Sequence, residues 1–175
     1  MLDPARLVFI DETAVTTNMV RLSGWAPRGT RLVAHAPFGD WGTLTFVAAL
    51  RHDKMTAPMV MEGSMTGEMF RTYIKQCVVP TLQRNDIVTM DNLAAHKVAG
   101  IQEAIENAGA TLRYLPKYSP DLNPIELPYS KFKRLLRSAA ARSLRAIYRT
   151  IRSFVRDLGP DECANYFRHA GYASI

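Results

Sequence analysis

The sequence Leu7-Val8-Phe9-Ile10 is a short apolar run that stops at Asp11 and Glu12, and the mostly apolar run Ile87-Val88-Thr89-Met90 stops in the same way at Asp91. Each run has the length and composition of a buried β-strand that ends in a polar loop. Asp11 and Asp91 are therefore each predicted to sit one residue past a strand. Parallel strands place their carboxyl ends along one edge of a sheet, where such folds keep their functional sites. If the two strands are neighbours, the two carboxylates meet at that edge.

The spacing of apolar residues places the other strands of the first part of the chain. Strands are predicted over residues 31–36 and 44–50, with a turn at 37–40, and a weaker signal over 58–61 extends this sheet. Strands joined so tightly leave no room for a crossover helix, so we expect them to pair antiparallel.

Helices alternate with strands in the second part of the chain. The elements expected there are a helix over 70–78 stopped by Pro80, the strand over 87–90, a helix over 98–108 closed by Gly109, a strand over 111–115, a loop over 116–124 and two final helices, the second over 144–158. Strand-helix-strand connections of this length make parallel pairs. The 175 residues fit one core. The sequence thus predicts a single α/β domain over residues 1–175, with helices covering a mixed sheet in three layers.

The net charge of +6 is unevenly distributed along the chain. Residues 113–156 contain eleven Lys and Arg against two acids, a local charge of +9, which leaves −3 for the rest. This asymmetry indicates a polyanionic partner bound on one side, with solvated helix faces as the alternative.

Other features of the composition favour a cytoplasmic protein with no membrane partner. No apolar run approaches the ~20 residues of a membrane helix, and the first residues lack the pattern of a secretory signal. Cys77 and Cys163 lie in helical segments, spell no metal-binding pair, and are interpreted as buried reduced thiols.

Carboxylates that meet at a sheet edge repel one another, by about 4 kcal/mol per pair at ~4 Å and an effective dielectric of 20. Such a cluster shares protons or binds a cation. Oxygen-only ligands favour Mg²⁺ or Mn²⁺, and ions with open coordination positions suit in-line phosphodiester displacement. For Asp11 alone, an ordinary loop or cap residue is the alternative interpretation.

The third acid is less well defined, because Asp121, Glu126 and Glu12 all compete for the role. Asn123-Pro124-Ile125-Glu126 has the pattern of an N-cap, a first-turn proline and a capping-box glutamate, so Glu126 has an alternative role as a helix cap. Pro128 argues against that role, because it would press on the Pro124 carbonyl of a helix beginning at Asn123. We therefore expect the helix to start late or to bend there.

Three segments occur in a recognisable order: Phe9-Ile10-Asp11-Glu12-Thr13, Met90-Asp91-Asn92-Leu93-Ala94-Ala95-His96-Lys97 and Leu115-Pro116-Lys117-Tyr118-Ser119-Pro120-Asp121-Leu122-Asn123-Pro124-Ile125-Glu126. Together they resemble the mariner-type transposase superfamily, specifically its bacterial insertion-sequence branch, whose catalytic unit is called a DDE superfamily endonuclease domain. The resemblance runs from about Leu7 to about Leu158.

Carried over by position, the resemblance makes Asp11, Asp91 and Glu126 the catalytic and metal-binding acids, and the 34 residues between the last two match the family spacing. It implies Mg²⁺ or Mn²⁺, with one ion bound jointly by the two aspartates and a second shared with Glu126. The implied fold is ribonuclease H-like, a mixed five-stranded sheet flanked by helices. The implied activity is phosphodiester hydrolysis and strand transfer at element ends, which is cut-and-paste DNA transposition. Asn92 and His96 match positions near the site, where they are expected to orient a carboxylate or contact DNA.

The expected partner is double-stranded DNA, both the terminal repeats of the element and its target. Work on paired ends, which the resemblance also implies, would suit a homodimer. Family members carry a helix-turn-helix region before the catalytic domain, whereas the first strand here begins within a few residues of Met1, so we expect a separate or missing N-terminal recognition region. Phosphate contacts are expected from the following basic residues: Lys117, Lys131, Lys133, Arg134, Arg137, Arg145, Arg149 and Arg152.

Relatives place a Trp close behind the third acid, where this chain has Pro128-Tyr129, and Tyr129 is expected to fill that packing position. Asp121 matches a motif residue that forms the loop.

Two other functions stay open. One is a catalytically silent remnant that binds DNA or a partner through its basic face. The other is a different nuclease of the same fold, such as a junction resolvase or a ribonuclease H, against which the motif at residues 119–126 argues.

Overall fold

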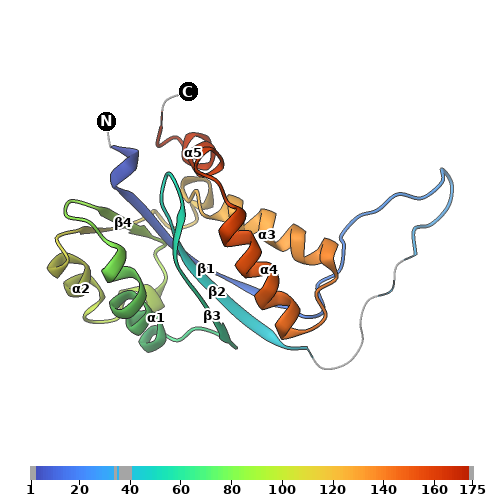
Figure 1. Cartoon of the computed structure of the whole chain (residues 1–175), viewed down its shortest axis with the longest axis horizontal. Helices are drawn as coiled ribbons and strands as arrows, with labels where there is room; N and C mark the ends of the chain where they lie inside the picture. Colours follow the sequence, from blue (N-terminus) through green and yellow to red (C-terminus); the bar gives the residue numbers. More distant parts are fainter. Residues whose placement is uncertain (1–2, 34, 36–40, 174–175) are drawn as a thin grey trace.

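A single mixed sheet forms the centre of the molecule in the computed structural model, which describes residues 3–33, 35 and 41–173 (Figure 1). Its five strands lie in the order β3-β2-β1-β4-β5. The pairs β1–β2 and β2–β3 are antiparallel, and the pairs β1–β4 and β4–β5 are parallel. The predicted mixed five-stranded sheet is therefore confirmed, with these bounds: β1 Leu7–Thr16, β2 Thr43–Leu50, β3 Met55–Glu62, β4 Ile87–Met90 and β5 Thr111–Tyr114.

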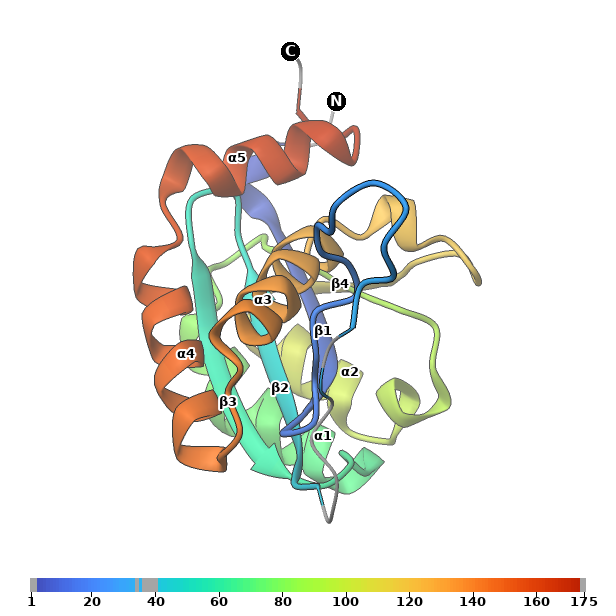
Figure 2. The same ribbon diagram turned by 90° about the vertical axis from the view of Figure 1, so that its right-hand side faces the viewer.

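Helices cover both faces of this sheet, which gives the three predicted layers (Figure 2). One layer contains α1 (Gly67–Tyr73), which continues through a π-helical segment, and α2 (Ile101–Asn107); the other contains α3 (Glu126–Ala139), α4 (Leu144–Asp157) and α5 (Pro160–His169). Three short 3-10 helices each come before one of these elements. Pro4–Arg6 precedes β1, Ala94–Lys97 precedes α2, and Pro120–Leu122 precedes α3. None of the helices in the described part of the chain combines the length and apolar character needed to cross a membrane.

The alternation of side chains along β1 assigns its residues to the two cores. Leu7 and Phe9 belong to the core under α3, α4 and α5, whereas Val8 and Ile10 belong to the core under α1 and α2. Successive side chains of a strand point to opposite faces. Asp11 and Glu12, the next two residues, consequently belong to different sides of the sheet.

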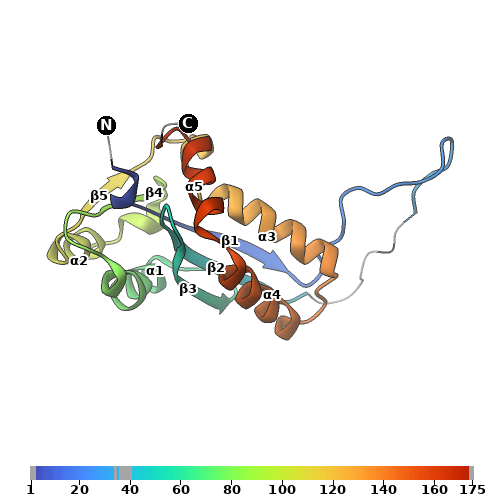
Figure 3. The ribbon, with the colours of Figure 1, turned by 45° about the horizontal axis from the view of Figure 1, so that its top comes forward.

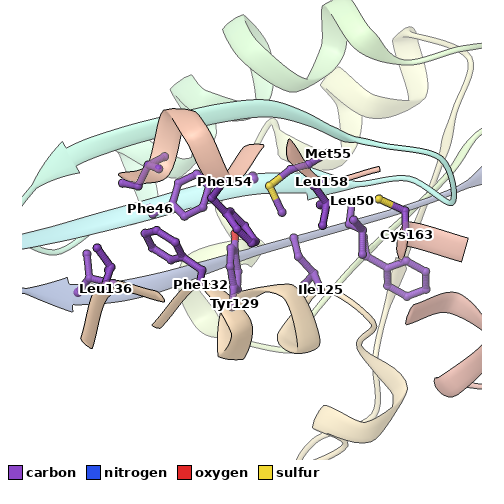
Figure 4. Close-up of a cluster of buried hydrophobic side chains, with 14 of the residues drawn as sticks. Phe46, Leu50, Met55, Ile125, Tyr129, Phe132, Leu136, Phe154, Leu158 and Cys163 are labelled. Atoms are coloured by element: carbon purple, nitrogen blue, oxygen red, sulfur yellow. The ribbon is translucent and has the colours of Figure 1, made fainter. Parts of the chain in front are cut away.

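The core under α3, α4 and α5 combines aliphatic side chains with a group of aromatic rings in contact (Figure 4). Phe132 of α3 lies between Phe46 of β2 and Phe154 of α4, with ring centroids 5.4 and 5.2 Å away. Phe167 of α5 packs edge-on against Phe9 at 5.4 Å. The prediction of two closing helices is wrong, because α5 forms a third one after the break at Gly159 (Figure 3).

The strand predicted over 31–36 is also wrong for its described residues. Residues 31–33 and 35 are neither helix nor strand, and Val33 is 76% exposed. Both sides of β1 and of β2 are already paired, so this segment has no free position beside them. The chain from 17 to 33 instead runs outward from the end of β1 (Figure 1). The predicted turn at 37–40 lies outside the described residues. The strand signal at 58–61 is confirmed within β3.

β1 is longer than predicted, and this changes the setting of Asp11. Its parallel pairing with β4 ends at Ile10 and Met90, but its antiparallel pairing with β2 continues to Thr16. Asp11 therefore lies inside a strand, and the prediction that it sits one residue past a strand is wrong. The same prediction is confirmed for Asp91, which follows the last residue of β4.

Candidate active site

Asp11 and Asp91 lie side by side where β1 and β4 separate. Ile10 and Met90 are paired neighbours of these parallel strands, so the next residue of each chain comes at the same level. Glu126, the first residue of α3, lines the same cavity of about 380 Å³ as the two aspartates. The structure thus brings together the three acids that the sequence singled out.

Burial and neighbouring acids favour the neutral form of Asp11. Its side chain lies almost entirely out of solvent, and burial, followed by the charge of Glu126, raises its pKa to about 8. Glu12 and Asp91 raise the pKa further, while the hydrogen bond from the Glu12 backbone N–H, 2.8 Å long, opposes the shift. A divalent cation would relieve this repulsion by balancing the carboxylate charges.

Asn123 holds the other side of the Asp11 carboxylate. Its Nδ2 donates a hydrogen bond of 2.8 Å to Asp11 Oδ2, and the residue is only 4% exposed. The N-cap role considered for Asn123 is wrong, because α3 begins at Glu126 with Ile125 as its N-cap and no capping side chain. The same observation removes the capping-box alternative for Glu126.

The first turn of α3 shows why the late helix start is needed. Pro128 is the third residue of the helix, a position at which the missing N–H is not required. Tyr129 follows, fully buried against Phe46 at 5.6 Å between ring centroids. Its hydroxyl donates to the backbone carbonyl of Asp11 at 2.6 Å. Burial raises the pKa of this phenol well above its usual value, which keeps it a donor.

His96 contacts Asp91 from the opposite side of the sheet. It is completely buried, its Nδ1 lies against Asp91 Oδ1, and its Nε2 donates to Glu12 Oε2 at 2.9 Å. The ring stacks on Phe70 with 4.1 Å between centroids. Burial alone would lower the pKa of His96, but the hydrogen bonds with Asp91 and Glu12 outweigh it and raise the pKa to about 10. Asn92, the other predicted supporting residue, lines the cavity.

The predicted DNA-contacting residues fall into three places. Lys117 lines the acid cavity. Lys133, Arg134 and Arg137 of α3 line a wider groove of about 1050 Å³, whose other wall is residues 21–25. The remaining predicted residues lie on or beside α4: Lys131, Arg145, Arg149 and Arg152. α4 packs on β3, at the edge of the sheet remote from β5. Lys131 also forms an ion pair of 2.5 Å with Glu162.

The donor atoms around the cavity suit hard divalent ions. Among the described residues no three His, Cys, Asp or Glu side chains already converge closely enough to form a finished metal site. The cavity nevertheless offers carboxylate oxygens from three acids, and the buried Oδ1 atoms of Asn92 and Asn123 have no hydrogen-bond partner in the described part of the chain. Oxygen donors of this kind are the ligands that Mg²⁺ and Mn²⁺ prefer.

A mixed sheet in the order β3-β2-β1-β4-β5, with helices on both faces and acids where β1 and β4 separate, defines a ribonuclease H-like fold. A family model described as DDE superfamily endonuclease matches residues 6–147. The chain belongs to this family. No curated protein sequence matches it.

Solved structures of the Mos1 transposase share the fold. The Mos1 strand transfer complex has a TM-score of 0.72 at 15% identity, over 95% of this chain and 52% of that one. The Mos1 mariner paired-end complex with Mn has a TM-score of 0.70 at 15% identity, over 96% and 53%. The Mos1 catalytic domain with Raltegravir and Mg has a TM-score of 0.62 at 13% identity, over 96% and 78%. The chain thus spans about half the length of the first two.

Proposed function

We propose that this chain is the catalytic domain of a DNA transposase, which hydrolyses phosphodiester bonds and transfers strands at the ends of a mobile element by cut and paste. The observation that carries the proposal is the parallel register that sets Asp11 beside Asp91, with Glu126 lining the same cavity. Membership of the DDE superfamily endonuclease family supports it.

In this proposal Asp11 and Asp91 hold one divalent ion together, and one of them shares a second ion with Glu126. When bound, such ions activate the attacking water or DNA 3′-hydroxyl and stabilise the leaving oxygen. Asn123 and the Glu12 N–H fix the orientation of the Asp11 carboxylate. The Mos1 paired-end complexes determined with Mn and with Mg support the choice of ion.

The proposed partner is double-stranded DNA, held through its phosphates. Lys117, which lines the acid cavity, would contact the phosphates nearest the acids, and Lys133, Arg134 and Arg137, which line the groove beside α3, would contact further phosphates. The Mos1 strand transfer complex and pre-cleavage transpososome support a DNA substrate. Action as a homodimer and origin in a bacterial insertion sequence are further parts of the proposal.

The test is cleavage of a duplex carrying the element's terminal repeats in Mn²⁺. Asp11→Asn, Asp91→Asn and Glu126→Gln should each lower the cleavage rate by at least about 10³-fold, because several kcal/mol of transition-state stabilisation depend on the ions. DNA binding, measured in parallel, should persist. Asp121→Asn is the matched control, since Asp121 is an exposed acid of the same loop, and it should cleave normally.

The other outcomes are equally informative. Normal cleavage by Glu126→Gln would place the third acid elsewhere. Normal cleavage by Asp11→Asn would refute the proposed site. A wild-type chain that binds the duplex and never cuts it would favour the silent remnant.

A further inference from the structure

Glu12 is the acid of the first motif that the proposed metal site does not use. It follows Asp11 in β1, so its side chain points to the opposite face of the sheet, toward α1 and α2. It does not line the cavity that contains Asp11, Asp91 and Glu126. Its carboxylate therefore has no direct access to the proposed reaction.

Glu12 nevertheless reaches the second acid through one buried side chain. Its Oε2 accepts the Nε2–H of His96 at 2.9 Å, and the other ring nitrogen of His96 lies against Asp91 Oδ1. The imidazole is completely buried and stacks on Phe70 at 4.1 Å, so packing fixes the plane of the ring. The three side chains thus form a chain across the sheet from Glu12 to Asp91.

The contacts of Asp91 are all made by one of its two oxygens. Oδ1 forms an ion-pair contact with His96 Nδ1 and accepts a hydrogen bond of 3.3 Å from the backbone N–H of Leu93. Within the described residues Oδ2 has no hydrogen-bond donor. Because a hydrogen bond and an ion-pair contact both fall on Oδ1, they restrict the rotation of the carboxylate and leave Oδ2 available on the side of the cavity that Asp91 lines.

We propose that Glu12 is a positioning residue that acts on Asp91 through His96, setting the orientation in which Asp91 binds a divalent ion. This inference rests on the proposed metal-dependent function. Glu12 orients the imidazole, the imidazole orients Asp91 through Oδ1, and Asp91 offers its other oxygen to the ion. The link depends on the reach of the Glu12 side chain and on its ability to accept a hydrogen bond.

Two substitutions distinguish the effect of the side-chain length of Glu12 from the effect of its charge. Glu12→Gln keeps the length and the acceptor oxygen but removes the charge, whereas Glu12→Asp keeps the charge and withdraws the acceptor by one methylene. Mn²⁺ is titrated into each protein without DNA, and free Mn²⁺ is followed by electron paramagnetic resonance. Glu103→Asp is the matched control, because Glu103 is an exposed acid of α2 in the same layer. Thermal unfolding of every variant is recorded alongside.

We expect Glu12→Asp to weaken Mn²⁺ binding by about 10- to 100-fold, the usual loss when a residue behind a metal ligand is removed. Glu12→Gln should stay within about threefold of the wild type, as should Glu103→Asp. An unchanged affinity in Glu12→Asp, or an equal loss in Glu12→Gln, would overturn the positioning role. Absence of saturable Mn²⁺ binding by the wild type would instead contradict the proposed function itself, and the inference with it.

Discussion

The two sides of the acid cavity are built differently. On the strand side, the carboxylates of Asp11 and Asp91 are each held by buried partners, Asn123 for the first and His96 for the second. On the helix side, Glu126 is exposed at the start of α3, and no hydrogen bond or ion pair within the described residues holds its carboxylate. The sheet therefore holds two acids in place, while the third has no partner among the described residues.

This difference follows from what supports each side chain. The aspartates belong to or directly follow paired strands of the central sheet. The position of the Glu126 side chain depends on the loop over 116–125 and on the first turn of α3. A contact from outside that loop is the hydrogen bond of 2.7 Å from the Tyr172 hydroxyl to the Leu122 carbonyl.

The largest effect is expected from substitution of Asp11, which should change cleavage activity and thermal stability in opposite directions. Asp11→Asn should abolish cleavage and yet raise the melting temperature of the metal-free protein near pH 8. The pKa of Asp11 is raised from 3.8 to about 8 in the fold, so the stability it contributes is fully present below pH 4 and is lost as the pH rises toward 8. Thermal unfolding in a chelator between pH 4 and pH 9 measures this loss.

Asp11→Asn should flatten the profile between pH 4 and about pH 6.5, where Asp11 is the group expected to cause the decline. The decline at higher pH should remain, because the raised pKa of His96, about 10, gives stability that is present below its ordinary value of 6.5 and lost toward pH 10. Saturating Mg²⁺ should reduce the loss of stability that Asp11 causes in the wild type as the pH rises above 4. A wild-type profile that rises between pH 5 and pH 8 would contradict the assignment of a buried, acid-surrounded Asp11.

A smaller effect is expected when the partner of Asp11 is removed. Asn123→Ala leaves a buried carboxylate oxygen without its donor, which costs about 1–3 kcal/mol in the free energy of unfolding. Cleavage should fall by about 10- to 100-fold, less than for loss of the acid itself. Denaturant unfolding and cleavage assays measure the two quantities. Cleavage within threefold of the wild type would show that Asp11 needs no such support.

The sequence predicted the strand side of the site better than its surroundings. Two apolar runs that end in acids were sufficient to place Asp11 and Asp91 at one sheet edge, although β1 continues to Thr16 because β2 still pairs with it there. Glu126 was assigned mainly by family resemblance, since its local pattern also fits a helix cap. Only Pro128 hinted at the late helix start that the structure shows.

The contacts between distant segments could not be read from local patterns. Asn123 matches an N-cap by its neighbours in sequence, but it bonds to a residue 112 positions away. The contact between Glu12 and His96 spans 84 positions. Residues 31–33 have the composition of a strand, yet a strand also needs a free sheet edge. In α5 only Cys163 and Phe167 are buried, so its apolar period is too sparse to detect.

The smallest expected effect concerns the support of the helix side. Tyr172→Phe removes the hydrogen bond to Leu122 but keeps the ring against Phe9, whose centroid is 4.8 Å away. We expect a loss of about 1 kcal/mol in unfolding free energy and only a few-fold decrease in cleavage. Tyr148→Phe, at an exposed position of α4, is the control and should change neither. A loss of cleavage as large as that of Asn123→Ala would mean that Glu126 is as tightly positioned as the aspartates.

The number of Mn²⁺ ions bound per chain tests the division between the two sides most directly. Electron paramagnetic resonance titration of the wild type, Asp11→Asn and Glu126→Gln gives this number without any dependence on DNA. Two pre-positioned aspartates and a free third acid predict that Glu126→Gln still binds one ion, while Asp11→Asn loses saturable binding altogether. Complete loss of binding in Glu126→Gln, or unchanged binding in Asp11→Asn, would contradict the account.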